Sequence, residues 1–102
     1  MFFKRKYKRF SEPDNTAVFT TTFVVREQRP ITYVTHEEDD GAWQFFSDDK
    51  FEDFEQVAMI VSLAEIVKMD PTLVELADMP VGHFAERNGK NGSWTIKVKK
   101  PF

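Results

Sequence analysis

The chain has 102 residues, of which 41% are hydrophobic and 15% aromatic, and eleven of them are phenylalanine. This length and composition predict one packed domain rather than a disordered chain. No cysteine is present, so disulfides, thiol catalysis, zinc–thiolate sites and iron–sulfur clusters are excluded. The sequence contains neither a membrane-spanning apolar run of about 18 residues nor the apolar stretch of a secretory signal. We therefore expect a cytoplasmic protein without a membrane span.

The net charge of −3 is distributed unevenly along the chain. Five of the fourteen basic residues lie in the first ten positions: Lys4, Arg5, Lys6, Lys8 and Arg9. The remainder carries nine basic and seventeen acidic residues, a net charge of −8. The acidic part should repel nucleic acid and attract cations or basic proteins.

The basic start has two interpretations. Phe3, Tyr7 and Phe10 lie at helical spacing between basic residues, which suits an arm that binds nucleic acid or an anionic membrane surface. A solvated tail whose aromatic side chains pack on the edge of the domain explains the same pattern. In both cases we expect residues 1–16 to form a basic arm and linker, and residues 17–102 a single domain.

The first half of the domain shows three strand patterns. Apolar and β-branched residues predict a strand from Ala17 to Val25, and a second from Ile31 to Thr35. Because only about five residues connect them, we expect these two strands to form a hairpin. Trp43 to Ser47 predicts a third strand, and Asp48 to Gln56 a loop or a helical turn.

Val57 to Val61 is apolar at every position, which is typical of a central strand buried on both faces. We expect the rest of the domain to pack around it. Ser62 and Glu65 have the spacing of a capping box at the start of a helix, with Val61 and Ile66 as its hydrophobic staple.

A second helix start follows at Asp70-Pro71, where the aspartate can cap and proline suits the first helical position; Pro80 ends this helix. Val81 to Arg87 predicts a strand. The two Asn-Gly pairs in Asn88 to Gly92 predict a hairpin turn into a last strand. In that strand Trp94, Ile96 and Val98 share one face, and Lys97 and Lys99 lie on the opposite, wet face.

Together these elements predict an α+β fold. We expect a mostly antiparallel, twisted sheet of about five or six strands, with a pair of short helices inserted before the C-terminal hairpin.

Catalytic and metal-binding patterns are weak. His36, beside Glu37 and Glu38, suits a general base, but a solvated surface histidine explains it better, and His83 is expected to be structural. No EF-hand, H-E-x-x-H, phosphate-binding glycine loop or G-x-S-x-G pattern occurs. The adjacent carboxylate pairs do not suit glycoside hydrolysis, because neighbouring residues point in different directions. We expect no catalytic site, no metal, no cofactor and no enzymatic activity.

Acidic and aromatic residues alternate between His36 and Glu55. A strand cannot bury the adjacent Phe45 and Phe46 on one face, so Trp43 and Phe45 should point inward and other aromatic residues should stay near the surface. Aromatic anchors within an acidic rim suit a basic protein partner, although acids that only keep the domain soluble remain the alternative. The candidate partner-binding residues are Glu37, Glu38, Asp39, Asp40, Trp43, Phe46, Asp48, Asp49, Phe51 and Phe54.

Several short motifs follow one another along the chain in a characteristic order: Pro30-Ile31-Thr32-Tyr33, Asp40-Gly41-Ala42-Trp43, Phe45-Phe46-Ser47-Asp48-Asp49, Leu63-Ala64-Glu65-Ile66, Asp70-Pro71, Pro80-Val81-Gly82 and Glu86-Arg87. This order resembles a short bacterial domain of unknown function that is also catalogued as family thirty-three of the polymorphic-toxin immunity proteins. The resemblance covers about Ala17 to Lys99 and leaves out the basic arm. Asp40-Gly41-Ala42 replaces the small-residue turn of that family, and Asp48-Asp49-Lys50 replaces its glycine-containing segment.

The resemblance implies a small cytoplasmic antidote that binds one toxin and blocks it without chemistry of its own. A stand-alone binding or regulatory module without a toxin is the second hypothesis. A small-molecule-binding or enzymatic domain that uses His36 and neighbouring carboxylates is the third. A toxin reading frame directly upstream of the gene would favour the antidote.

Overall fold

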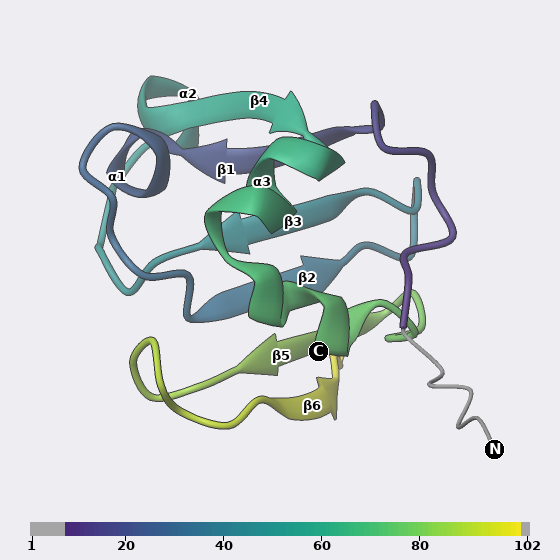
Figure 1. Ribbon diagram of the computed structural model, residues 1–102. Helices are drawn as coiled ribbons and strands as arrows, with labels where there is room; N and C mark the ends of the chain where they lie inside the picture. The colour runs from purple at the N-terminus through teal and green to yellow at the C-terminus, as the bar shows by residue number, and fades with distance from the viewer. Residues whose placement is uncertain (1–7, 101–102) are drawn as a thin grey trace, which may run out of the picture.

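The computed structural model describes residues 8–100, which form one six-stranded sheet with short helices. The strand order is β4-β1-β3-β2-β5-β6, and every neighbouring pair is antiparallel except β1 with β3 (Figure 1). The strands are β1 (Ala17–Thr21), β2 (Tyr33–His36), β3 (Trp43–Phe46), β4 (Ala58–Ser62), β5 (His83–Glu86) and β6 (Thr95–Val98). The predicted α+β fold with a mostly antiparallel sheet is confirmed.

The helical segments are α1 (Thr22–Val25), α2 (Phe54–Val57), α3 (Leu63–Met69) and the 3-10 helix η1 (Pro71–Leu76). In Figure 1, α3 lies in front of the sheet, followed by the unlabelled turns of η1. Leu63, Ile66, Leu73 and Leu76 on these two helices are buried against the sheet. Among residues 8–100, no helix combines the length and the apolar character needed to cross a membrane.

The capping box at the start of α3 is confirmed. The Ser62 hydroxyl accepts from the Glu65 amide at 3.1 Å, and the Glu65 carboxylate accepts from the Ser62 amide at 3.4 Å. Val61 packs against the core cluster that contains Ile66, in agreement with the predicted staple. Asp70 caps η1 by accepting from the Thr72 amide at 3.1 Å. Both starts were predictable because caps depend on residues close in sequence.

The predicted strand from Ala17 to Val25 is too long. β1 ends at Thr21, whose hydroxyl accepts from the Val24 amide at 3.4 Å and begins the turn α1. This turn brings Val24 into the core, where it is 1% exposed. The burial of Val24 and the threonine cap outweigh the β preference of the run.

The predicted hairpin between the first two strands is wrong. β1 pairs with β4 and β3, through Phe19 opposite Ile60 and Phe19 opposite Gln44, whereas β2 pairs with β3 and β5. The turn α1 and the segment to Thr32 carry the chain across two strand positions, about 10 Å. β3 fills the position between β1 and β2.

The apolar strand is an edge strand, not the centre of the sheet. Within residues 8–100, β4 pairs only with β1, and Ile60 is 63% exposed. The other edge also differs from the prediction, because Ile96 and Val98 of β6 are exposed at 44% and 59%. The helix layer does not cover β6 (Figure 1). The predicted hairpin between β5 and β6 is confirmed.

The segment before β1 packs on the domain. Phe10 meets the Trp43 ring edge to face at a centroid distance of 4.9 Å, and the Trp43 indole donates to the Glu12 carboxylate at 2.8 Å. Lys8 lies 3.4 Å from the carboxylate of Asp78. The edge packing predicted for the aromatic residues of the arm therefore holds for Phe10. Phe3, Lys4, Arg5, Lys6 and Tyr7 lie outside the described residues.

A buried ion pair joins the helix layer to the sheet. Arg87 follows β5, and its guanidinium donates to the Asp70 carboxylate, to the Thr72 hydroxyl at 3.0 Å and to the Ile31 carbonyl at 2.9 Å. The Trp94 ring covers the guanidinium at 4.2 Å. Asp70-Pro71 and Glu86-Arg87, two motifs of the family resemblance, therefore meet through Asp70 and Arg87, which serve the fold.

Candidate functional site

The side chains of β3 alternate between the two faces of the sheet. Trp43 and Phe45 point into the helix-covered core and are 1% and 0% exposed, as predicted, whereas Phe46 points to the opposite face. Residues paired across neighbouring strands share a face. Tyr33 is paired with Phe46 and with Glu86, so β2 and β5 also contribute side chains to the face opposite the helices.

Five aromatic rings gather on this side of the sheet. Tyr33 stacks on Phe84 at 5.3 Å and lies 6.3 Å from Phe46, while Phe54 lies 5.6 Å from Phe46 and 5.8 Å from Phe51. These centroid distances are those of interacting aromatic pairs. All five rings are partly exposed, and Phe51 is 40% exposed. We call the surface formed by Tyr33, Phe46, Phe51, Phe54 and Phe84 the aromatic face.

The aromatic face is hollowed between β2, β3 and the loop before α2. The hollow measures about 510 Å³ and is lined by Thr32, Tyr33, Phe46, Ser47, Asp48, Phe51, Glu86 and Arg87. Partial burial raises the pKa of Tyr33, so its hydroxyl remains protonated and is able to donate to a partner. The lining therefore combines three aromatic rings with polar and charged side chains, among them the carboxylates of Asp48 and Glu86.

The carboxylates after β3 are held in place by Arg29. The guanidinium lies 3.2 Å from the Asp48 carboxylate and 3.0 Å from that of Asp49, which also accepts from the Ser47 hydroxyl at 2.7 Å. The hydrogen bond from Ser47 and the one from Arg29 lower the pKa of Asp49. Asp49 is therefore tied into the loop, whereas the Asp48 side chain stays 73% exposed.

The predicted partner-binding residues fall into three groups. Phe46, Asp48, Asp49, Phe51 and Phe54 lie together on or beside the aromatic face. Trp43 is buried on the other side of the sheet and is closed to a partner, because the alternation that exposes Phe46 points Trp43 inward. The remaining four, Glu37, Glu38, Asp39 and Asp40, lie in the turn between β2 and β3.

That turn lies at the opposite end of β3 from Asp48, and four strand residues of about 3.3 Å each separate them. The nine carboxylates between His36 and Glu55 therefore form two acidic regions, one at each end of β3. Glu37, in the first region, still lies near enough to Tyr33 to help raise its pKa. Glu37 is held by Lys99 at 3.0 Å. Partial burial opposes the ionisation of Glu37, but the Thr35 hydroxyl and Lys99 outweigh it, and the pKa of Glu37 is lowered.

Two members of the aromatic face, Tyr33 and Phe84, were not predicted. Each alternates with a buried small or β-branched residue, Val34 and Ala85, and that alternation was the available signal. Their proximity to Phe46 depends on the pairing of β2 with both β3 and β5, which the sequence pattern does not specify.

His36 is not the solvated surface residue expected. Its ring stacks on Trp43 at 3.9 Å, and only 12% of its side chain is exposed. Nδ1 donates to the Met79 carbonyl at 2.8 Å, and Nε2 lies 3.7 Å from the Glu12 carboxylate. His36 thus bridges the sheet, the segment before β1 and the segment after η1. His83 is partly exposed and contacts the Val81 carbonyl through Nδ1 at 3.1 Å.

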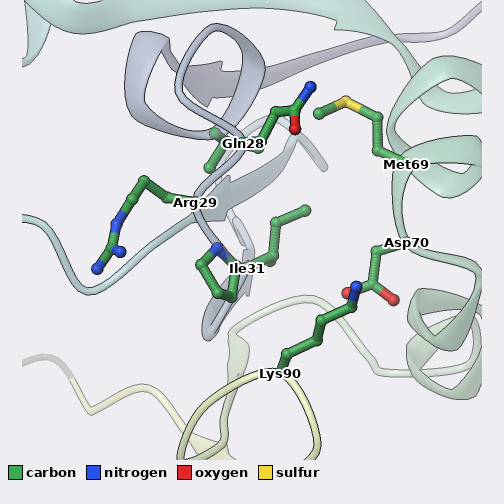
Figure 2. Close-up of a pocket in the computed structure, with 8 residues that line it drawn as sticks. Gln28, Arg29, Ile31, Met69, Asp70 and Lys90 are labelled. Atoms are coloured by element: carbon green, nitrogen blue, oxygen red, sulfur yellow. The ribbon is translucent and has the colours of Figure 1, made fainter.

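A second cavity lies on the helix side, between the loop after α1 and the end of α3. It measures about 310 Å³, and Figure 2 shows Gln28, Arg29 and Ile31 on one side and Met69 and Asp70 on the other, with Lys90 from the β5–β6 loop below. Gln28 has a φ of 55°, and the Asp70 carboxylate is engaged by Arg87 and Thr72. Within residues 8–100, no group of three or more histidine, aspartate or glutamate residues is arranged to hold a metal ion.

The model of the "Immunity protein Imm33 domain" family matches residues 11–98. The chain belongs to the Imm33 family. The family suggested by the sequence motifs is therefore confirmed, and the matched region begins at Ser11, so it includes Glu12 and its contact with Trp43. All five rings of the aromatic face lie inside the matched region. No curated protein and no solved structure shows significant similarity to the chain.

Membership of an immunity family indicates a role in toxin immunity and implies a toxin as partner. Immunity protein families are generally non-enzymatic.

Proposed function

We propose that this protein binds one toxin and blocks it by covering a part of the toxin that its activity requires, and that the aromatic face is the binding surface. The observation that carries the proposal is the group of five partly exposed rings on the sheet face opposite α3 and η1, in a domain of an immunity family. Aromatic residues are enriched in binding hot spots because one ring buries a large area at a small entropic cost.

The charge around the aromatic face suggests the chemistry of the toxin. Asp48, Glu52 and Asp53 lie near Phe51 in the chain, with Lys50 as the one basic residue among them, and residues 11–102 carry a net charge of −8. Lys97, paired opposite Phe84, is bound to Glu86 at 2.8 Å. A negative field extends about 8 Å at physiological ionic strength and steers a basic surface toward the rings. A toxin with lysine and arginine around its active cleft is the proposed partner, with charges that set the association rate and rings that supply the affinity.

The proposed site of action is the cytoplasm, because a chain without cysteine needs no oxidising compartment. Binding of nucleic acid or of an anionic membrane through Lys4, Arg5, Lys6, Lys8 and Arg9 stays a separate prediction.

The test uses two lysine substitutions at side chains of matched exposure. Phe51 on the aromatic face is 40% exposed, and Met69 at the end of α3 is 43% exposed. The tagged chain captures its partner from a lysate of the native host; the captured protein is purified, and its dissociation constant is measured with each variant. We expect Phe51→Lys to weaken binding at least about thirtyfold, the size of a 2 kcal/mol hot spot, and Met69→Lys to leave it within about twofold.

Equal binding by folded Phe51→Lys and wild-type protein would contradict the aromatic face as the binding surface. A captured protein that does not inhibit growth when expressed alone would contradict the antidote function itself.

A further inference from the structure

The two edges of the sheet differ in how they are protected. β6 contains Lys97 and is followed by Lys99 and Lys100, and charged side chains, lysine above all, keep an exposed strand edge from pairing with another chain. β4, the other edge, has the sequence Ala58-Met59-Ile60-Val61-Ser62, which contains neither a charge nor a proline. Within the described residues, one edge therefore carries the usual protection and the other does not.

β4 is also well formed and accessible. All five of its residues pair with β1; Ile60 is exposed, and the other four are partly buried. Ile60, at 63%, is more exposed than the other large apolar side chains of residues 8–100. Figure 1 shows β4 along the border of the sheet, with α3 in front of the sheet rather than beyond this strand. The backbone groups of β4 that point away from β1 are therefore open to another strand.

We propose that β4 pairs with β4 of a second copy of this chain, antiparallel, across a two-fold axis through Ile60. In this register Ile60 faces Ile60, Met59 faces Val61, and Ala58 faces Ser62. All five residues of each strand then pair, apolar opposite apolar and small opposite small. Any other symmetric register pairs fewer residues of the strand.

A second copy suits this edge better than a charged partner. The strand offers no charge to attract an acidic or basic chain. Like charges directly opposite each other destabilise a cross-strand pair, and an identical uncharged strand brings none. The uniform apolar character that is typical of an interior strand is explained by the same pairing, because β4 becomes an interior strand in the dimer.

The dimer would have one continuous sheet of twelve strands, twice the six of one copy. Paired residues share a face, so both aromatic faces would lie on the same side, with the two β3 strands about five strand spacings, ~24 Å, apart. This arrangement of two toxin sites rests on the proposed function, whereas the pairing of β4 does not.

The test measures the mass of the full chain in solution by light scattering over a hundredfold range of concentration. We expect the wild-type mass to rise to twice that of the chain, and Ile60→Lys to keep the mass of one copy, because two lysines would face each other at the axis. Val98→Lys on the other edge, where the side chain is similarly exposed at 59%, should dimerise like wild type. A monomer at all concentrations, or a dimer that persists in Ile60→Lys, would overturn the proposal.

A cross-link tests the register directly, because the natural chain has no cysteine. Directly paired Cα atoms lie about 4.5–5.5 Å apart, within the range of a disulfide. With oxidised glutathione as the oxidant, Ile60→Cys should form a covalent dimer and Val98→Cys should not. Equal cross-linking of both variants would overturn the Ile60 axis. Toxin binding by a monomeric Ile60→Lys protein would leave the proposed function intact, so the two proposals fail separately.

Discussion

Replacing Arg87 by methionine should be among the most damaging single changes in this domain. The Arg87 side chain is 1% exposed and that of Asp70 is 10% exposed, so the carboxylate would remain in a mostly dry environment without its counter-charge. Breaking a buried ion pair by removing one partner costs about 3–5 kcal/mol. The Ile31 carbonyl and the Thr72 hydroxyl would lose their donor as well. A loss of this size is a large part of the ~5–15 kcal/mol that stabilises a typical domain.

The assay is urea unfolding followed by circular dichroism at one fixed protein concentration. Arg29→Met is the matched control, because Arg29 also pairs with aspartate, here Asp48 and Asp49, but its side chain is 44% exposed. We therefore expect a far smaller loss. Asp70→Asn keeps a side chain able to cap η1 while it removes the charge. In the double variant Asp70→Asn/Arg87→Met, the loss should fall short of the sum of the single losses by at least about 1 kcal/mol.

Two results would refute this reasoning. A loss for Arg87→Met no larger than that for Arg29→Met would show that the buried ion pair does not hold η1 to the sheet. Additive losses in the double variant would show that Asp70 and Arg87 stabilise the domain independently.

Three further predictions follow from the described contacts. Ser62→Ala should lower the free energy of unfolding by about 1 kcal/mol because it removes the cap of α3, and an equal urea midpoint for the exposed control Ser93→Ala would contradict the capping box. The lowered pKa of Asp49 contributes stability that is present above its ordinary pKa of 3.8 and is lost as the pH falls through the lower folded-state value. Asp49→Asn should therefore flatten the acid side of a plot of thermal midpoint against pH. An unchanged slope would contradict this contribution of Asp49. Asp48→Lys/Glu52→Lys beside Phe51 should slow association with a basic toxin more than Glu38→Lys/Asp39→Lys in the turn at the other end of β3, and equal stopped-flow rates for the two variants would contradict steering toward Phe51 and its neighbouring rings.

Local sequence signals predicted the local structure well. The caps at Ser62 and Asp70 and the hairpin after β5 depend on residues a few positions apart, so short motifs specify them. The inward position of Trp43 and Phe45 followed from strand alternation alone.

The order of the strands was not predictable in the same way. Phe19 pairs with both Gln44 and Ile60, and these long-range partners determine that β3 lies between β1 and β2. An apolar run such as Val57 to Val61 does not show whether a strand lies in the centre or at the edge, because an edge that pairs with another chain has the same composition.

The candidate site was predicted in part for the same reasons. Phe46, Phe51 and Phe54 are close in sequence, and the adjacent pair Phe45-Phe46 indicated that one ring must leave the core. Tyr33 and Phe84 join them only through the pairing of β2 with β3 and β5. The acidic turn was grouped with Phe46, Phe51 and Phe54 because it is near them in sequence, although the length of β3 separates it from them in space.

The most direct test of the central claim is the growth of cells that produce the toxin together with variants of this protein. The account predicts that wild-type protein and Met69→Lys protect the cells and that Phe51→Lys, produced at the same level and folded, does not. Full protection by Phe51→Lys would contradict the claim that the aromatic face blocks the toxin.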